Sequence, residues 1–199
     1  MKIHNFKQGT DEWYQSRLGK LTGSEFHVFF GKSKTRDTLL YKKASEIITS
    51  QRSDQDSFSN IHTARGSENE VFAMQSYYFE TGREVNEVGF VELNNWIGSS
   101  PDGLVGDDGI IEIKSPDNHT FLYNCNKAYI KPEYKTQIQF NLFTTGRKWC
   151  DFILYNPKFD KPLKIIRINR DDEFIDKIKK TTDEVIKEIN DIINQFNLK

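Results

Sequence analysis

One short run near the middle of the chain, IIEIK at residues 110–114, most constrains how this sequence can fold. Apolar and charged side chains alternate along it, with the two-residue period of a β-strand. The GDDG tetrapeptide directly before it is typical of a turn, so the strand is expected to follow a hairpin. Ile111 and Ile113 are therefore predicted to pack on a core, and Glu112 and Lys114 to lie together on the opposite face.

The order of the other elements indicates the fold class. Expected helices lie at residues 10–18, from about 24, and at 35–50, 63–80, 132–145 and about 171–197, and expected strands at 87–93, 96–98, 110–114, 148–155 and 163–168. Polar residues 51–60 are expected to form an exposed loop. Helices followed by strands and then by mixed elements predict an α/β or α+β fold, with a mixed central sheet flanked by helices.

Composition narrows the class of protein. With 199 residues and 36% hydrophobic content, the chain suits one core, so a single domain over residues 1–199 is predicted. The net charge of −1 does not indicate a nucleic-acid binder by bulk charge, so any DNA contact must be local. Cys125 and Cys150 form no CxxC pattern, and four scattered histidines favour no histidine-rich metal site. The chain has no signal-peptide pattern and no membrane-length apolar run, which predicts a cytoplasmic protein with no membrane contact.

The candidate chemistry lies around the expected hairpin. Asp102, in Ser-Pro-Asp-Gly before the turn, and Glu112, after it, can meet across the hairpin, and Lys114 points to the same side as Glu112. Phosphodiester hydrolysis needs hard cations held by carboxylates, and a nearby ammonium can orient the attacking water. The alternative is an ordinary turn beside a solvated strand face, which composition alone does not exclude.

Two helix signals add to this picture. Thr22-Gly23-Ser24-Glu25 matches the capping box S/T-x-x-E, which predicts a helix start whose backbone N–H groups favour an anion. Arg17, just before it, can supply a guanidinium to the same anion. The isoleucine-rich final helix is expected to dock on the core, and a coiled-coil or subunit contact is the alternative.

From about residue 8 to 157, the chain resembles the phage lambda exonuclease type within the PD-(D/E)xK nuclease superfamily. The ordered matches that carry the resemblance are Gln8-Gly-x-Asp-x-Trp13, Arg17-Leu-Gly19, Thr22-x-Ser24-Glu25, Gly66-x-x-x-Glu70 ahead of Ala73, Ser100-Pro-Asp-Gly-Leu104, Glu112-x-Lys114-x-Pro116 and Gln137-x-Gln139. A chain of ordered matches is far more specific than any one of them. The resemblance implies a restriction-endonuclease-like core.

The resemblance also implies residue roles in a metal centre. Asp102 and Glu112 correspond to the metal carboxylates, with the Ile113 carbonyl as a further ligand and Lys114 as the catalytic lysine. Glu70 corresponds to the acid that completes a second Mg²⁺ site. Periodicity alone does not separate it from other glutamates on the same expected helix.

A second group is implied to bind DNA ends. The family's equivalents of Arg17, Ser24, Ser100 and Gln137 hold a terminal 5′-phosphate. Without the resemblance, an ordinary helical arginine and a capping serine would be the simpler interpretation.

The function implied is a 5′→3′ exonuclease on linear double-stranded DNA with 5′-phosphate ends, using two Mg²⁺ ions that Mn²⁺ can replace. It would leave 3′ single-stranded tails for a single-strand annealing recombinase of a bacteriophage-type pathway, and would act as a ring-shaped homotrimer. An endonuclease of the same superfamily and a non-catalytic DNA-binding assembly protein are the alternatives.

Overall fold

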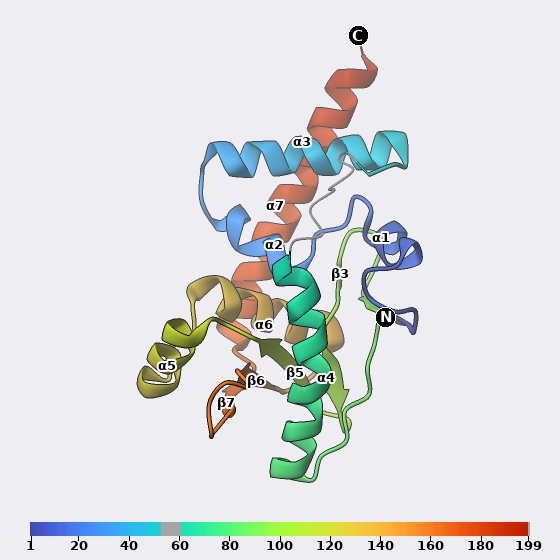
Figure 1. The fold of residues 1–199 in the computed structure, drawn as a ribbon. Helices are drawn as coiled ribbons and strands as arrows, with labels where there is room; N and C mark the ends of the chain where they lie inside the picture. The colour runs from blue at the N-terminus through green and yellow to red at the C-terminus, as the bar shows by residue number, and fades with distance from the viewer. Residues whose placement is uncertain (53–60, 199) are drawn as a thin grey trace.

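The computed structural model describes residues 1–52 and 61–198, with side-chain environments for 1–52 and 69–198. The loop expected over 51–60 lies mostly outside that part of the chain. In chain order (Figure 1), the elements are β1 (Lys2–His4), α1 (Asp11–Arg17), α2 (Gly23–Phe26), the 3₁₀ helix η1 (His27–Phe30), α3 (Lys34–Thr49), α4 (Ile61–Thr81), β2 (Phe90–Glu92), β3 (Gly98–Ser99), β4 (Gly103–Val105), β5 (Gly109–Lys114), α5 (Asn118–Lys127), α6 (Pro132–Thr145), β6 (Trp149–Tyr155), β7 (Leu163–Asn169) and α7 (Asp172–Asn197).

The central sheet has the strand order β4-β5-β6-β7, and a smaller sheet has the order β1-β2-β3. In the central sheet β5 is antiparallel to β4 but parallel to β6, and β6 is antiparallel to β7. The mixed α/β architecture expected from the sequence is therefore confirmed. Parallel neighbours need a crossover connection because a tight hairpin joins only antiparallel strands, and α5 and α6 form that crossover.

The expected strands that precede β5 do not all join the same sheet as β5. β2 and β3 pair within the smaller sheet, and the chain then enters the central sheet at Gly103. Pro101 lies in the connection and has no N–H to continue a ladder. As a result, Asp102 lies between the two sheets, directly before β4.

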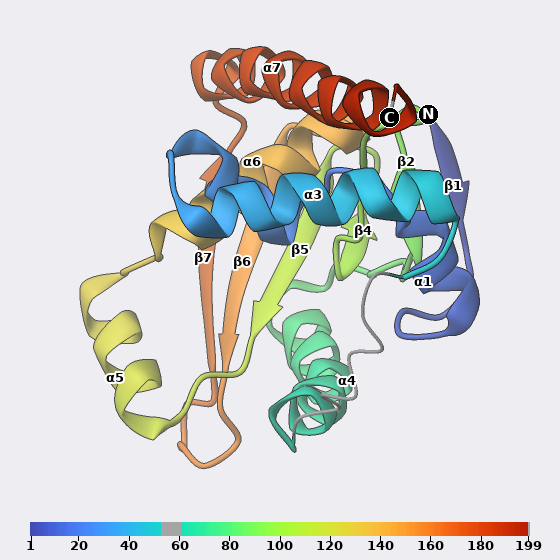
Figure 2. The same ribbon diagram turned by 90° about the horizontal axis from the view of Figure 1, so that it is seen from above.

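Helices cover both faces of the central sheet. Ala73 of α4 packs with Ile111 on one face, while Leu142 of α6 packs with Ile110 on the other. Figure 2 shows β5, β6 and β7 side by side, with α5 to one side and α4 to the other. The alternative interpretation, in which the Glu112 face of β5 is only a solvated strand face, is thus wrong: a strand with a parallel neighbour is buried on both faces.

The amphipathic helix α7 docks on the chain's own core. Its Val185 and Ile189 are buried in one cluster with Phe26 of α2 and Leu40 of α3, and Figure 1 shows α3 crossing α7. This is the simpler of the two interpretations of its isoleucine pattern. In the described part of the chain, no helix combines the length and apolar character needed to cross a membrane.

Three elements were not among the strands and helices expected from the sequence: β1, β4 and α5. The strand β1 is only three residues long, so it carries little periodicity, and it forms by pairing with β2 far along the chain. The helix α5 is polar, but it has a start signal that could have revealed it: the Asp117 side chain accepts a hydrogen bond from Thr120 N–H as an N-cap.

A buried ionic contact fixes α4 on the sheet. Asp151 of β6 is 2% exposed, and its Oδ2 accepts hydrogen bonds from Tyr77 Oη at 2.7 Å and from Arg167 Nη2 at 2.9 Å. Burial and the bond to Asp151 raise the pKa of Tyr77 to about 12, so the phenol remains a donor. One helix and two strands are thereby joined through a single carboxylate.

We expect Tyr77→Phe to lower the free energy of unfolding by about 1 to 2 kcal/mol, because it removes one donor from a buried carboxylate. Urea unfolding followed by circular dichroism measures this. The matched control is Tyr78→Phe, since Tyr78 is 49% exposed on the same helix; it should change stability by less than about 0.5 kcal/mol. Equal losses in both variants would contradict the assigned role of the Tyr77 hydroxyl.

Candidate active site

A buried carboxylate lies at the centre of the candidate site. Glu112 is 1% exposed, and its Oε1 accepts hydrogen bonds from Lys114 Nζ and from Gln137 Nε2, both at 2.7 Å. Its Oε2 accepts from Asn141 Nδ2 at 3.2 Å. Gln137 and Asn141 lie one turn apart on α6, so one face of this helix donates two amides to the strand carboxylate.

Asp102 lies at the same centre as Glu112, but it comes from the connection before β4 rather than from β5. Its Oδ2 accepts a hydrogen bond from Ile113 N–H at 2.6 Å. The pairing of Gly103 with Ile111 sets this approach. A Cβ on Gly103 would lie 2.2 Å from Val85 Cγ1, so only glycine lets the chain pass this closely. The structure therefore brings Asp102, Glu112 and Lys114 together.

Charge is unbalanced at this centre. Burial, and next the charge of Glu112, raise the pKa of Asp102 well above its ordinary value. Burial also raises the pKa of Glu70, although Lys114 opposes that shift. For Lys114, burial lowers the pKa, but Glu112 and Asp102 outweigh it and the net shift is upward. Three carboxylates thus share one ammonium.

The donor set suits a hard cation, but the described side chains are not already arranged around one. Among them, no three acidic, histidine or cysteine groups converge so that they could hold a metal ion. Instead, Glu112 and Asp102 are engaged by the donors described above. Mg²⁺ and Mn²⁺ prefer oxygen ligands, and either ion would relieve the repulsion between the carboxylates. The residue types therefore fit such an ion after side-chain rearrangement.

Two of the expected phosphate ligands are in contact. Arg17 Nη1 donates a hydrogen bond to Ser100 Oγ at 3.2 Å, and its guanidinium stacks 4.2 Å from the Trp13 ring centre. Trp13 Nε1 also donates to Ser100 Oγ, at 2.8 Å. Burial lowers the pKa of Arg17, with Glu25 as the largest opposing influence. Sequence reasoning assigned no role to Trp13, although it belongs to the first matched motif.

Of the other two expected phosphate ligands, Gln137 lies at the acidic centre. Gln137 is bonded to Glu112, and Gly23 abuts Gln137 so tightly that a Cβ there would lie 3.2 Å from the Gln137 carbonyl oxygen. Ser24 is exposed and follows Gly23 directly. The sequence alone did not reveal that Gln137 and Asn141 are partners of Glu112. Their four-residue spacing on α6 is the signal that could have indicated it.

The capping box at Thr22 is not formed. Thr22 is the N-cap of α2 by position, but its hydroxyl makes no capping bond. It donates to Glu25 Oε1 at 3.1 Å and accepts from Arg17 Nη2 at 3.2 Å. Because α2 has only four residues, the expected helix-dipole contribution at Ser24 is small. The expectation of anion binding in this region therefore depends on Arg17 rather than on the start of α2.

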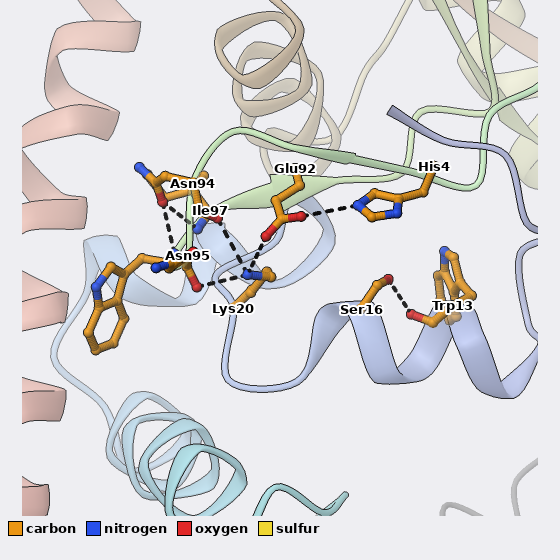
Figure 3. A network of polar contacts seen from close by, with 9 residues as sticks. His4, Trp13, Ser16, Lys20, Glu92, Asn94, Asn95 and Ile97 are labelled. Carbon is orange, nitrogen blue, oxygen red and sulfur yellow. Dashed lines mark hydrogen bonds and ion pairs between the residues drawn. The ribbon is translucent and has the colours of Figure 1, made fainter. Parts of the chain in front are cut away.

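A polar network holds the segment between α1 and α2 in place (Figure 3). Lys20 Nζ lies 3.0 Å from Glu92 Oε1 and donates to the Asn95 carbonyl at 2.9 Å, while His4 contacts the other oxygen of Glu92 at 3.1 Å. The bond from His4, and next the one from Lys20, lower the pKa of Glu92. These contacts tie the segment that follows Arg17 to the hairpin that leads into Ser100.

Comparison with known proteins places this geometry in a family. A model of the YqaJ-like viral recombinase domain matches residues 12–148. The alkaline exonuclease LHK-Exo from Laribacter hongkongensis is 34% identical, with a TM-score of 0.87 over 94% of this chain and 96% of its own. Its structure with dAMP is 35% identical over the same shares, also with a TM-score of 0.87.

A phage-related exonuclease from Haemophilus somnus 129PT shares the fold, with 19% identity and a TM-score of 0.67 over 89% of this chain and 96% of its own. No curated protein sequence matched this chain significantly. The lambda-exonuclease resemblance expected from the motifs is confirmed by the family model and by LHK-Exo. The chain belongs to the YqaJ-like viral recombinase domain family, together with the alkaline exonuclease LHK-Exo.

Proposed function

We propose that this protein is a metal-dependent exonuclease that degrades one strand of linear double-stranded DNA, 5′ to 3′, from 5′-phosphorylated ends. The observation that carries the proposal is the contact between Arg17 and Ser100, because Ser100 lies only two residues before Asp102 of the acidic centre. Two residues span at most about 7 Å of chain, and a DNA strand rises roughly 3.4 Å per nucleotide. A phosphate held at Ser100 would therefore leave a bond only one or two nucleotides away at the acidic centre.

The residues of the centre have distinct parts in this proposal. Glu70, Asp102, Glu112 and the Ile113 carbonyl would hold two Mg²⁺ ions, with Mn²⁺ able to replace them. Such ions would supply charge stabilisation to the scissile phosphoryl oxygens. Lys114, which keeps its proton and already contacts Glu112, would orient the attacking water. A nucleoside monophosphate is the expected product, and LHK-Exo has been solved with dAMP.

Two alternatives differ in testable ways. An endonuclease of the same superfamily would share the acidic centre but would need no terminal-phosphate group. A non-catalytic assembly protein would need no intact Asp102, Glu112 and Lys114 set. Incubating end-labelled linear duplex and covalently closed circular DNA with Mg²⁺ separates them. Exonuclease action predicts loss of one strand from the 5′ ends of the linear form, leaving 3′ tails, while the circle stays intact.

We expect Asp102→Ala, Glu112→Ala and Lys114→Ala each to reduce cleavage by at least about a hundredfold, because each removes a group that acts on the scissile phosphate. DNA affinity should fall much less. The measurement is initial rate on labelled linear duplex in Mg²⁺, beside filter binding of the same DNA in Ca²⁺, whose looser coordination should support binding without cleavage.

Asp107→Ala is the matched control, since this acid is exposed in the turn between β4 and β5. It should cleave at the wild-type rate. Vigorous cleavage in excess chelator, or by Asp102→Ala, would contradict the metal centre.

We expect Arg17→Ala to slow digestion of a 5′-phosphorylated duplex by roughly ten- to a hundredfold, the kinetic equivalent of losing a charge-assisted contact worth about 1.5 to 3 kcal/mol. Digestion of the same duplex with a 5′-hydroxyl should hardly change, because the partner of the guanidinium is absent there. Comparing the two substrates in both proteins isolates the contact.

Lys34→Ala is the control for general charge, because Lys34 is exposed at the start of α3. It should affect both substrates alike and only slightly. An equal loss on both substrates in Arg17→Ala would mean that this arginine serves folding or general DNA contact, and the end-binding group would have to be abandoned.

We also propose, from the family resemblance, that the protein acts as a ring-shaped trimer with DNA through its centre and that an annealing recombinase takes up the 3′ tails. A ring that encloses the DNA would hold it without bulk positive charge, which a protein of net charge −1 lacks. Light scattering at micromolar concentration should give three times the 23.3 kDa mass of the chain. A monomer that digests DNA distributively would contradict this.

A further inference from the structure

A buried lysine lines the same cavity as Arg17 and has no part in the function proposed above. Lys43 of α3 is 5% exposed, and its Nζ lies 2.6 Å from Glu25 Oε1 of α2 and 3.9 Å from Glu46 Oε2. Lysine is almost never buried unless its charge is paired. A buried ion pair is weak evidence for stability, because hydrophobic residues of similar volume often serve as well. An ammonium at this position is therefore a candidate for a role beyond packing.

A chain of hydrogen bonds leads from Lys43 to Arg17. Glu25 Oε1, which Lys43 contacts, also accepts a hydrogen bond from the Thr22 hydroxyl at 3.1 Å. Because that hydroxyl donates its hydrogen to Glu25, its oxygen remains an acceptor for Arg17, whose Nη2 donates to it at 3.2 Å. Arg17 Nη1 donates to the hydroxyl of Ser100. The guanidinium is thus held by two neutral hydroxyl groups.

Glu25 is the nearby group best able to neutralise Arg17. Burial lowers the pKa of Arg17, and the charge of Glu25 opposes that shift more than any other described group does. The two side chains share the Thr22 hydroxyl, and among the described contacts they form no direct hydrogen bond. Arginine and a carboxylate readily form a strong bidentate pair. A guanidinium in such a pair has little capacity left for a phosphate, so Arg17 can bind one only while Glu25 is held elsewhere.

The second carboxylate near Lys43 already has a structural partner. Glu46 of α3 is 6% exposed, and its Oε2 accepts a hydrogen bond from Gly19 N–H at 3.0 Å. Gly19 has a φ of +67°, and a Cβ on it would clash with Ile47, so α3 packs directly on the turn that follows Arg17. Glu46 therefore holds this turn, and Glu25 is the closer partner of the Lys43 ammonium.

The cavity beside Arg17 favours an anion. It has a volume of about 150 Å³, and its charged lining comprises Arg17, Lys42, Lys43, Arg52, Glu25 and Glu46. Four cations and two carboxylates leave a positive balance there. Arg52 stacks on Tyr14, with its guanidinium carbon 3.7 Å from the ring centre. Loss of the Lys43 charge would reduce the positive balance and, at the same time, release Glu25.

We propose that Lys43 is a positioning residue for Arg17: it holds the Glu25 carboxylate away from the guanidinium, which stays available to a terminal phosphate. The proposal rests on the proposed function, because that function assigns the phosphate to Arg17. Lys43 itself does not contact the phosphate. Its effect on DNA ends is transmitted through Glu25 and should disappear when residue 25 carries no charge.

The test compares duplexes that differ only in a 5′-phosphate or a 5′-hydroxyl. Two ratios are measured: that of the binding constants in Ca²⁺ and that of the initial cleavage rates in Mg²⁺. We expect Lys43→Met to lower both ratios by roughly five- to tenfold, less than the full loss in Arg17→Ala, because the guanidinium remains but pairs with Glu25. Weaker folding alone would affect both duplexes equally and leave the ratios unchanged, which would contradict the proposal.

Removing the charge of Glu25 should rescue the lysine variant. Lys43→Met/Glu25→Gln should recover the wild-type ratios, because glutamine keeps an acceptor for the Thr22 hydroxyl but has no charge to pair with Arg17. A direct contact between Lys43 and the phosphate would leave the double variant as impaired as Lys43→Met, and this result would overturn the proposal. Glu25→Gln alone provides the test if Lys43→Met does not fold: its ratios should equal or exceed those of wild type, and lower ratios would likewise overturn the proposal.

Arg36→Met is the matched control, because Arg36 lies on the same helix and forms a comparable ion pair, with Glu188 of α7 at 2.7 and 2.8 Å. This variant should lower the unfolding midpoint and leave both ratios at the wild-type value. A change as large as that in Lys43→Met would mean that loss of any ion pair on α3 disturbs Arg17. The specific role of Lys43 would then have to be abandoned.

Wild type and Arg17→Ala in the same assays separate this inference from the function on which it rests. Wild-type ratios near one, or unchanged ratios in Arg17→Ala, would refute the proposed end binding and the inference with it. High wild-type ratios that fall in Arg17→Ala but persist in Lys43→Met would refute the positioning role alone.

Discussion

Burial of the Glu112 carboxylate is the constraint on which the rest of this structure depends. A charged group in the interior is costly unless donors replace the water that it loses. Here an ammonium from the same strand and two amides from α6 replace it. The helix must therefore cross β5 at the turn that carries Gln137 and Asn141. This requirement fixes the position of α6, the helix that lies beneath α2, α3 and α7, as well as the site.

The sequence predicted the local features well and the long-range ones poorly. The alternation at residues 110–114 placed Glu112 and Lys114 on one face, and the structure agrees. It did not show that α6 covers that face, because the partner of a strand face lies far along the chain. The motifs likewise grouped Gln137 with the phosphate ligands, whereas the structure also bonds it to Glu112. Spacing identifies neighbours on one element, not contacts between elements.

Failures of local reasoning have a similar cause. Thr22 and Glu25 match a capping box, but Arg17 and Lys43 compete for the same side chains. Arg17 takes the Thr22 hydroxyl as an acceptor, and Lys43 lies 2.6 Å from Glu25 Oε1. A charged partner binds a carboxylate more strongly than a backbone N–H does, so the helix start loses its cap. This exchange of hydrogen-bond partners joins α1, α2 and α3 in one polar network beside Ser100.

The connection from β3 to β4 links this network to the acidic centre. Within four residues, Ser100 contacts Arg17, Asp102 contacts Ile113, and Gly103 enters the central sheet. Gln8 Nε2 donates to the Pro101 carbonyl at 3.2 Å, which holds the middle of the connection. Pro101 restricts the backbone here, and Gly103 cannot be replaced without a clash. The covalent chain therefore sets the distance between Ser100 and Asp102. The proposed function requires a fixed distance between the groups that hold two successive phosphates, and a connection tied at both ends and in the middle provides it.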